Sequence, residues 1–266
     1  MRPTLTLIRR EFSAYFLSPI AYVVLAIFLA ITGYLFARAV DQLTATGPKG
    51  IEYPMRLLLG LGDLQSLRGV LEFLAFWLVF LIIPPLLTMR LLAEERASGT
   101  LEVLLTAPLR DWQIVLSKFL ACYGFYIFLW LPTLLYVPVL LDVDWATWKT
   151  GIDPWPVVSA YLGLALVGAM FLSLGLFISS LVKSQMVAAL IALFLSLLFI
   201  VAGFWQPEID TGSVLYQVRF FLTVPLHFER NFSRGLVDTR QLVLYASVTV
   251  FFLFLTVRSL ESRRWR

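Results

Sequence analysis

Residues 154–182 of the chain read PWPVVSAYLGLALVGAMFLSLGLFISSLV, and none of them is Asp, Glu, Lys or Arg. An α-helix needs roughly 20 consecutive apolar residues to cross the ~30 Å hydrocarbon core of a bilayer. A helix also satisfies every backbone hydrogen bond within one such segment. This stretch therefore predicts a transmembrane helix, and it sets the fold class of the chain.

Five further stretches also lack Asp, Glu, Lys and Arg: 12–37, 73–89, 119–141, 184–207 and 241–257. The 266 residues are 60% apolar and 14% charged, with a mean hydropathy of +0.85, whereas soluble domains carry far more charge. We therefore predict an all-α integral membrane protein with six transmembrane helices. Residues 1–266 are expected to form a single transmembrane domain, which leaves no room for a nucleotide-binding domain.

The basic residues predict the orientation of these helices, because Lys and Arg are more frequent on the cytoplasmic side of a membrane. With both termini inside, the cytoplasmic segments hold 12 of the 21 basic residues, and the outer segments hold 11 of the 17 acidic residues. The basic cluster at 258–266 is the strongest anchor. We expect a multi-pass protein of a bacterial or archaeal cytoplasmic (inner) membrane, with both termini in the cytoplasm.

The N-terminal residues 1–18 form a separate feature. Their apolar side chains recur at spacings of three and four, with Arg9 and Arg10 on the opposite side, as in an amphipathic helix at the membrane interface. Ser18 and Pro19 suit the start of a new helix, because Ser is a good N-cap and Pro is tolerated in the first turn. The alternative is that residues 1–18 extend the first transmembrane helix.

The outer segment 205–240, between the fifth and sixth predicted spans, also has helical spacing. Apolar residues recur along it, and Pro225 and Gly235 interrupt the pattern. We predict a helical segment that lies on the extracytoplasmic surface or re-enters the membrane.

The chain lacks the residues of several kinds of site. Its single histidine, His227, excludes a metal site built on two histidines, and its single cysteine, Cys122, has no disulfide partner within the chain. No G-x-x-x-x-G-K-S/T loop is present to hold nucleotide phosphates, and no Asp or Glu lies deep in a predicted span. We expect no catalytic, cofactor-binding or metal-binding residues, so an intramembrane enzyme is the least favoured hypothesis.

Residues 94–109 are polar and lie between the second and third apolar stretches, on the predicted cytoplasmic side. Gly99 and Thr100 suit the start of a helix, and Pro108 suits its end. The apolar face of this helix has three leucines: Leu101, Leu104 and Leu105. Since so short a helix is marginal in water, the leucines either insert into the groove of a partner protein or pack on the chain's own spans or the bilayer surface.

This segment resembles the signature of ABC-2 type permeases, the membrane subunits of ABC transporters. The resemblance rests on an acidic-basic start, a Gly-Thr-Leu-Glu sequence, two leucines, a Thr and a Pro, followed by DWQIVLSKF at 111–119. It implies that 94–109 is a cytoplasmic coupling helix that docks on an ATPase subunit. The residues that it assigns to ATPase coupling are Glu94, Glu95, Arg96, Gly99, Thr100, Leu101, Glu102, Leu104, Leu105 and Pro108.

The resemblance also implies the cofactors and partners. ATP and Mg would be bound by two partner ABC ATPase subunits, with no cofactor in this chain. A second permease copy or a paralogous permease would complete the complex, so a homodimer and a heterodimer both stay open. The lipid bilayer is a further partner, and we expect no nucleic acid.

Residues 225–240, PLHFERNFSRGLVDTR, resemble the gliding-motility-associated subgroup of these permeases. This leaves two hypotheses for the function. The first is an ATP-driven exporter that is coupled through its cytoplasmic helix to a separate ATPase subunit. The alternative is a non-translocating transducer that moves or regulates a large extracytoplasmic auxiliary protein.

Overall fold

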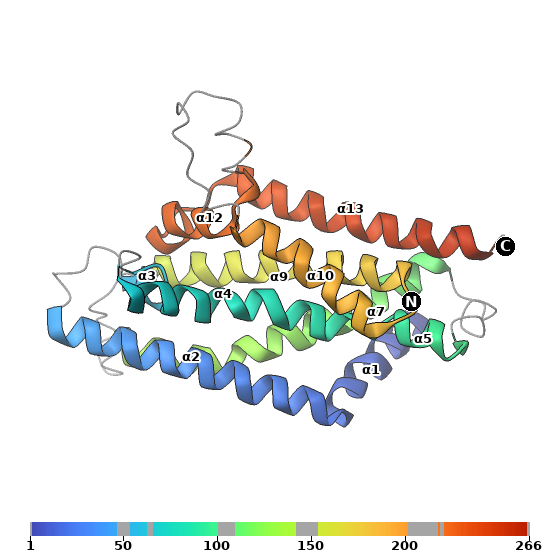
Figure 1. Ribbon diagram of the computed structural model, residues 1–266, viewed down its shortest axis with the longest axis horizontal. Coiled ribbons are helices and arrows are strands. Elements are labelled where there is room, and N and C mark those ends of the chain that lie inside the picture. The colour runs from blue at the N-terminus through green and yellow to red at the C-terminus, as the bar shows by residue number, and fades with distance from the viewer. Residues whose placement is uncertain are drawn as a thin grey trace.

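The computed structural model describes residues 2–46, 54–62, 66–100, 110–141, 154–201, 218 and 221–264. All regular structure in these residues is helical (Figure 1), which confirms the prediction of an all-α fold. The longer helices are α1 (Arg2–Leu17), α2 (Pro19–Thr46), α4 (Leu67–Thr88), α7 (Asp111–Trp130), α9 (Trp155–Leu181), α10 (Gln185–Val201) and α13 (Thr239–Arg264). The shorter ones are α3 (Pro54–Leu58), α5 (Ala93–Ala97), η1 (Leu131–Leu135), α8 (Tyr136–Leu141), α12 (Val224–Arg230) and η2 (Phe232–Arg234).

Five stretches of helix among the described residues are long and apolar enough to cross a membrane. They are Pro19–Gln42, Leu67–Ala97, Asp111–Pro138, Trp155–Leu181 and Thr239–Ser262. Five of the six predicted spans therefore have a counterpart in the structure. The fifth predicted span, 184–207, contains α10, an apolar helix of 17 residues. At 1.5 Å per residue α10 is about 26 Å long, slightly less than the bilayer core, and residues 202–207 lie outside the described part of the chain.

The first predicted span, 12–37, has different boundaries in the structure. Helix α1 ends at Leu17 and α2 begins at Pro19, and the two helices meet at an angle, so α1 is not a straight continuation of α2 (Figure 1). Helix α2 also continues through Arg38, which the sequence pattern placed outside the span. Two carboxylates compensate this charge, because Arg38 lies 3.4 Å from Glu72 of α4 and 3.2 Å from Asp41.

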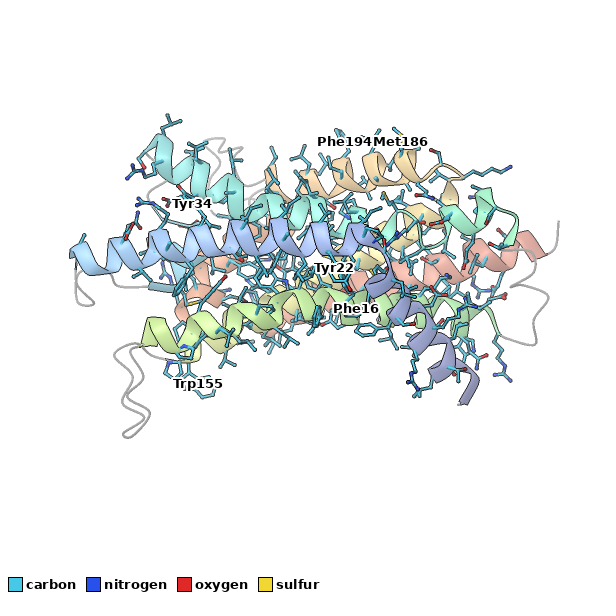
Figure 2. All side chains as sticks on the ribbon, turned by 90° about the horizontal axis from the view of Figure 1, so that it is seen from below. Phe16, Tyr22, Tyr34, Trp155, Met186 and Phe194 are labelled. Atoms are coloured by element: carbon cyan, nitrogen blue, oxygen red, sulfur yellow. The ribbon has the colours of Figure 1, made fainter. Side chains whose placement is uncertain are left out.

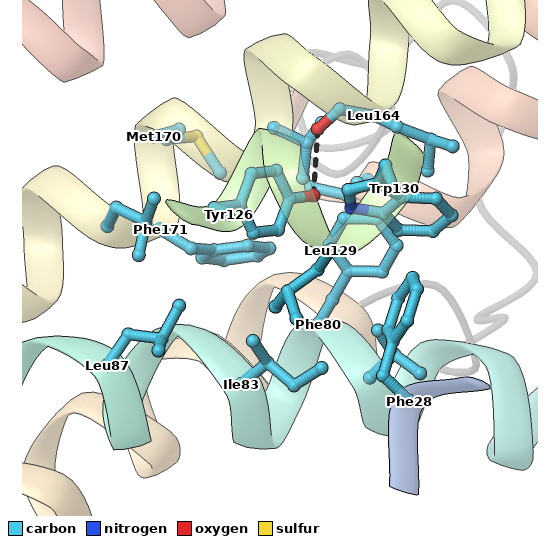
Figure 3. Packing of buried hydrophobic residues seen from close by; sticks show 14 of the residues in the cluster. Phe28, Phe80, Ile83, Leu87, Tyr126, Leu129, Trp130, Leu164, Met170 and Phe171 are labelled. Carbon is cyan, nitrogen blue, oxygen red and sulfur yellow. Dashed lines mark hydrogen bonds between the residues drawn. The ribbon is translucent and has the colours of Figure 1, made fainter. Parts of the chain in front are cut away.

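Helix α9 is the centre of the bundle and packs against α4, α7, α10 and α13. Glycines on α9 allow this close approach, as small residues do between membrane helices. A Cβ atom at Gly168 would overlap the ring of Tyr126 on α7, and one at Gly175 would overlap the side chain of Thr88 on α4. Figure 3 shows the surrounding core, in which the Tyr126 hydroxyl donates a hydrogen bond of 3.0 Å to the Leu164 carbonyl.

The two ends of the bundle differ. Both termini lie at the end that carries α5, and α3 and α12 lie at the opposite end (Figure 1). At that opposite end, Arg56 of α3 lies 2.9 Å from Glu229 of α12, and the buried His227 lies 2.6 Å from the hydroxyl of Tyr245 on α13. Of the predicted outer helical segment 205–240, the structure describes residue 218 and residues 221–240, and these include α12 and η2.

Candidate functional site

The chain leaves α4 and turns into α5 at one end of the bundle, and Ser179 near the end of α9 holds this turn. Its hydroxyl accepts hydrogen bonds from the backbone N–H groups of Leu92 (3.2 Å) and Ala93 (3.0 Å). The same hydroxyl donates to the carbonyl of Met89 at 3.1 Å. The first N–H groups of a helix have no partner within that helix. At the start of α5, the Ser179 hydroxyl of α9 supplies the missing hydrogen-bond acceptor.

Arg96 attaches the other end of α5 to the same helix. Its guanidinium donates a hydrogen bond of 3.0 Å to the backbone carbonyl of Ser180. Helix α9 ends at Leu181, and the last carbonyls of a helix attract cations. Together with Ser179, this contact fixes one side of α5 on α9.

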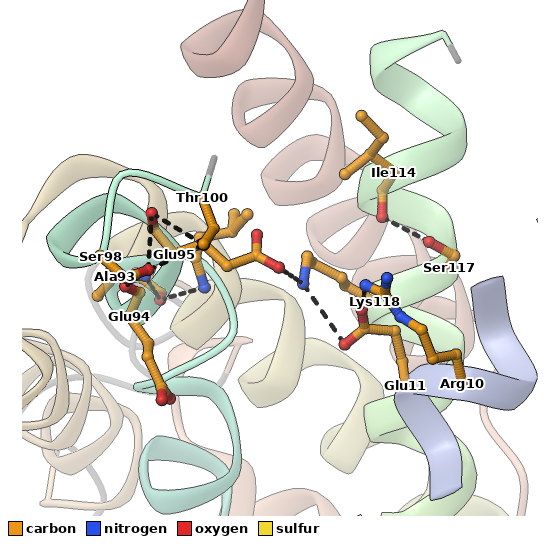
Figure 4. Close-up of polar contacts among 12 residues, drawn as sticks. Arg10, Glu11, Ala93, Glu94, Glu95, Ser98, Thr100, Ile114, Ser117 and Lys118 are labelled. Atoms are coloured by element: carbon orange, nitrogen blue, oxygen red, sulfur yellow. Dashed lines mark hydrogen bonds and ion pairs between the residues drawn. The ribbon is translucent and has the colours of Figure 1, made fainter. Parts of the chain in front are cut away.

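Lys118 of α7 faces the other side of α5 and is the centre of a buried ion-pair cluster (Figure 4). Its side chain is 2% exposed, and its Nζ lies 2.7 Å from Oε1 of Glu95 and 3.4 Å from Oε2 of Glu11 on α1. Arg10 lies 2.9 Å from the other oxygen of Glu11. A charge buried this deeply is stable when it is paired, so the cluster joins α1, α5 and α7.

A polar cavity of about 400 Å³ lies beside this cluster, between α1 and the segment around α5. Tyr15 and Arg90 form part of its wall. The Tyr15 hydroxyl donates a hydrogen bond of 3.1 Å to the Leu87 carbonyl, and burial raises the pKa of Tyr15 well above its ordinary value, so the hydroxyl keeps its proton. Arg90 lies over the Tyr15 ring at 5.8 Å and donates to the Ser18 hydroxyl at 3.1 Å. These contacts attach α1 to the end of α4.

Helix α5 ends at Ala97, before the leucines of the predicted coupling helix. The Ser98 hydroxyl donates back to the Glu94 carbonyl at 2.9 Å, and Gly99 has a φ of 74°, in the left-handed region that favours glycine. A Cβ atom at Gly99 would meet nothing within 4 Å, so the backbone angle, not space, favours glycine here. The turn at Gly99 thus ends α5 just before Thr100, where the sequence pattern begins the predicted helix. Residues 101–109 of that helix lie outside the described part of the chain, so it stays a prediction.

The structure describes half of the ten predicted coupling residues. Glu95 and Arg96 make the contacts above, Glu94 is exposed, Gly99 lies in the turn after α5, and Thr100 is helical again. The other five lie outside the described residues: Leu101, Glu102, Leu104, Leu105 and Pro108.

The residues of the site that the sequence did not assign to ATPase coupling include Glu11, Lys118 and Ser179. Lys118 had a sequence signal, because it is a lone cation followed by the uncharged stretch 119–141, and such a lysine needs an anionic partner. Ser179 had no such signal, since a serine in an apolar helix commonly bonds to its own backbone.

A comparison with protein families finds that a model described as ABC-2 family transporter protein matches residues 58–224. The match covers more than half of the chain and runs from the last residue of α3 to the first residue of α12. It includes α5, Lys118 and Ser179, and it excludes α1 with Glu11. None of the curated proteins compared with the chain matches it.

Proposed function

The chain belongs to the ABC-2 family of transporter proteins, and from this membership we propose that it forms half of an ATP-driven exporter in the cytoplasmic membrane. As a member of the family it is a non-catalytic, multi-pass permease subunit, and its partners are ABC ATPase subunits and the membrane. In our proposal two ATPase subunits bind ATP and Mg²⁺ and drive the permease through its surface at the α5 end.

The observation that carries this proposal is the attachment of α5. This helix of five residues is bonded to α9 through Ser179 and Arg96 and to α7 through Glu95. Residues 101–109 come directly after this attached segment. We propose that they dock on the ATPase, with Leu101, Leu104 and Leu105 in a groove of that subunit. A displacement of the docked segment would then act on both α9 and α7.

We further propose six membrane crossings, with α10 and the residues after it as the fifth. Both chain termini and α5 lie at one end of the bundle (Figure 1), which we place in the cytoplasm. The basic residues Arg9, Arg10, Arg90 and Arg96 at this end support the orientation through the positive-inside rule. Helix α1 would then lie at the inner membrane interface, as its amphipathic sequence suggests.

We place the second permease copy on the face that α4 and α10 share, since these helices pack against each other. Large apolar side chains point outward there, as Figure 2 shows for Met186 and Phe194. The exposed leucines of this face are Leu67, Leu71, Leu74, Leu78, Leu190 and Leu198. Helix α4 leads directly into α5, so movement at the ATPase contact would reach this interface.

The opposite end of the bundle favours the transducer as a second candidate. Helices α3 and α12 are joined by the ion pair between Arg56 and Glu229, and η2 is bonded to α9 by the Ser159 hydroxyl, which donates to the Phe232 carbonyl at 2.6 Å. Such a fixed surface suits the docking of an extracytoplasmic protein. The similarity of 225–240 to the gliding-motility-associated subgroup supports the same alternative.

The docking proposal is tested with Leu104→Asp and Leu105→Asp in the chain co-expressed with its ATPase subunit. A carboxylate in an apolar groove loses hydration without a partner, so both variants should lose ATPase co-purification and permease-stimulated ATP hydrolysis. Leu236→Asp is the matched control, because Leu236 is an exposed leucine at the opposite end of the bundle. Normal binding and hydrolysis by both variants would show that the leucines do not dock on the ATPase.

Reconstitution into vesicles separates the exporter from the transducer. An exporter should move a labelled lipid-linked or amphipathic compound across the bilayer when ATP is added. A transducer should hydrolyse ATP without such movement and should hold an extracytoplasmic protein in a fixed ratio.

A further inference from the structure

Lys118 occupies a position that the proposed docking of the ATPase does not use. It lies about two turns into α7, and its ammonium group lies between the carboxylates of Glu95 on α5 and Glu11 on α1 (Figure 4). These two carboxylates are 84 residues apart in the chain, and the cation brings their helices together. A shift of either helix therefore changes the surroundings of the same ammonium group.

The two contacts of Lys118 are unequal, and there is room beside them. The distance to Glu95 is 2.7 Å and that to Glu11 is 3.4 Å. Oε2 of Glu95 is buried without a hydrogen-bond partner, and the adjacent cavity measures about 400 Å³. A purely structural buried pair satisfies all of its oxygens in a tightly packed site. This arrangement instead leaves the ammonium group space to move between two acceptors.

The other side of α5 is held more firmly. Ser179 makes three hydrogen bonds to the backbone around the start of α5, and Arg96 bonds to the end of α9. A force on the segment after Gly99 would therefore tilt α5 about its contact with α9. The side that moves is the one that carries Glu95.

We infer that Lys118 is a positioning residue that transmits the tilt of α5 to α1 by exchanging Glu95 for Glu11. The inference rests on the proposed function, in which the ATPase moves the segment after α5. As Glu95 moves away, the ammonium group of Lys118 shortens its contact with Glu11 and so keeps an anionic partner. This draws α1 toward α7, against which α1 already packs. Arg10 pairs with Glu11 and so neutralises part of its negative charge both before and after the exchange.

The test uses the complex of the full chain with its ATPase subunit. The variant Lys118→Met/Glu95→Gln/Glu11→Gln removes all three charges and nearly preserves the side-chain volumes, so it leaves no buried charge unpaired. We expect it to keep the thermal stability and the ATPase binding of the wild type. Permease-stimulated ATP hydrolysis should fall about fivefold or more, the lower bound of a typical coupling energy. Lys118→Arg keeps the cation and should retain most of the stimulation.

A distance measurement reports the movement itself. Spin labels at Ser13→Cys on α1 and Ala97→Cys on α5, both exposed positions, are placed in a Cys122→Ala background. The distance between them should change when the ATPase is trapped with ATP and vanadate, and the neutral triple variant should abolish that change. Arg258→Met is the matched control, because Arg258 and Glu261 form an exposed ion pair of 2.7 Å on α13. Arg258→Met should alter neither the permease-stimulated ATP hydrolysis nor the change in the distance between the spin labels.

The outcomes separate this inference from the proposed function. Normal stimulation together with a normal distance change in the neutral triple variant would overturn the role of Lys118 and leave ATPase docking intact. Loss of ATPase binding in the triple variant would also overturn it, because Lys118 would then act in docking and not in transmission. A wild-type chain that binds no ATPase would overturn the proposed function and this inference together.

Discussion

At the scale of single residues, Ser179 shows how one hydroxyl holds a short helix, α5, in place. It is fully buried and bonds to three backbone groups between Met89 and Ala93. Ser179→Ala would leave two buried N–H groups unpaired, and each such group costs about 1–3 kcal/mol. We expect the thermal midpoint of the purified chain in detergent to fall by several degrees.

The control for this variant is Ser247→Ala on α13. The Ser247 hydroxyl is exposed and bonds to the Leu244 carbonyl of its own helix at 2.9 Å, so its loss should change the midpoint little. Equal midpoints for Ser179→Ala and the wild type would mean that water replaces the hydroxyl and that α5 is not fixed through Ser179.

Sequence patterns are informative at the scale of elements and less so at the scale of contacts. The uncharged stretches located the long helices because hydrocarbon excludes unpaired charge. The same rule misplaced the end of the first span, since Arg38 is tolerated in α2 once Glu72 and Asp41 compensate it. The hydrogen bonds of Ser179 depend on which helices become neighbours, and the pattern of a single helix does not contain that information.

The orientation of the elements is tested by cysteine labelling. Ser98, after α5, and Leu236, after η2, are exposed at opposite ends of the bundle. With α5 in the cytoplasm, Leu236→Cys should react with a membrane-impermeant maleimide in intact cells. Ser98→Cys should react only after permeabilisation. Cys122 is 1% exposed and should stay unlabelled, so the wild type is the blank. The reverse labelling pattern would place α5 outside and remove the basis for ATPase coupling.

At the scale of the whole molecule, the proposed dimer requires that one part of the apolar surface contact a second copy of the chain. Lipid tails cover apolar side chains as well as protein does, so exposure by itself does not identify an interface. The α4–α10 face differs from the exposed face of α13 in its connection to α5. An interface there would receive movement from α5 directly, whereas α13 follows α12 and η2 at the opposite end of the bundle and leads to the C-terminus (Figure 1).

This difference predicts which positions cross-link between two copies of the chain. A two-fold interface places residues near its axis next to the same residues of the partner. In a Cys122→Ala background, Leu190→Cys on α10 should form a disulfide-linked dimer of twice the 30.2 kDa chain mass under mild oxidation. Val250→Cys on α13 is equally apolar and exposed, at 65% against 63% for Leu190, and should stay monomeric. Native mass spectrometry should find two copies of the chain in the active complex. Cross-linking through Val250 and not Leu190 would move the interface to α13, and an active complex with a single six-span subunit would refute the dimer.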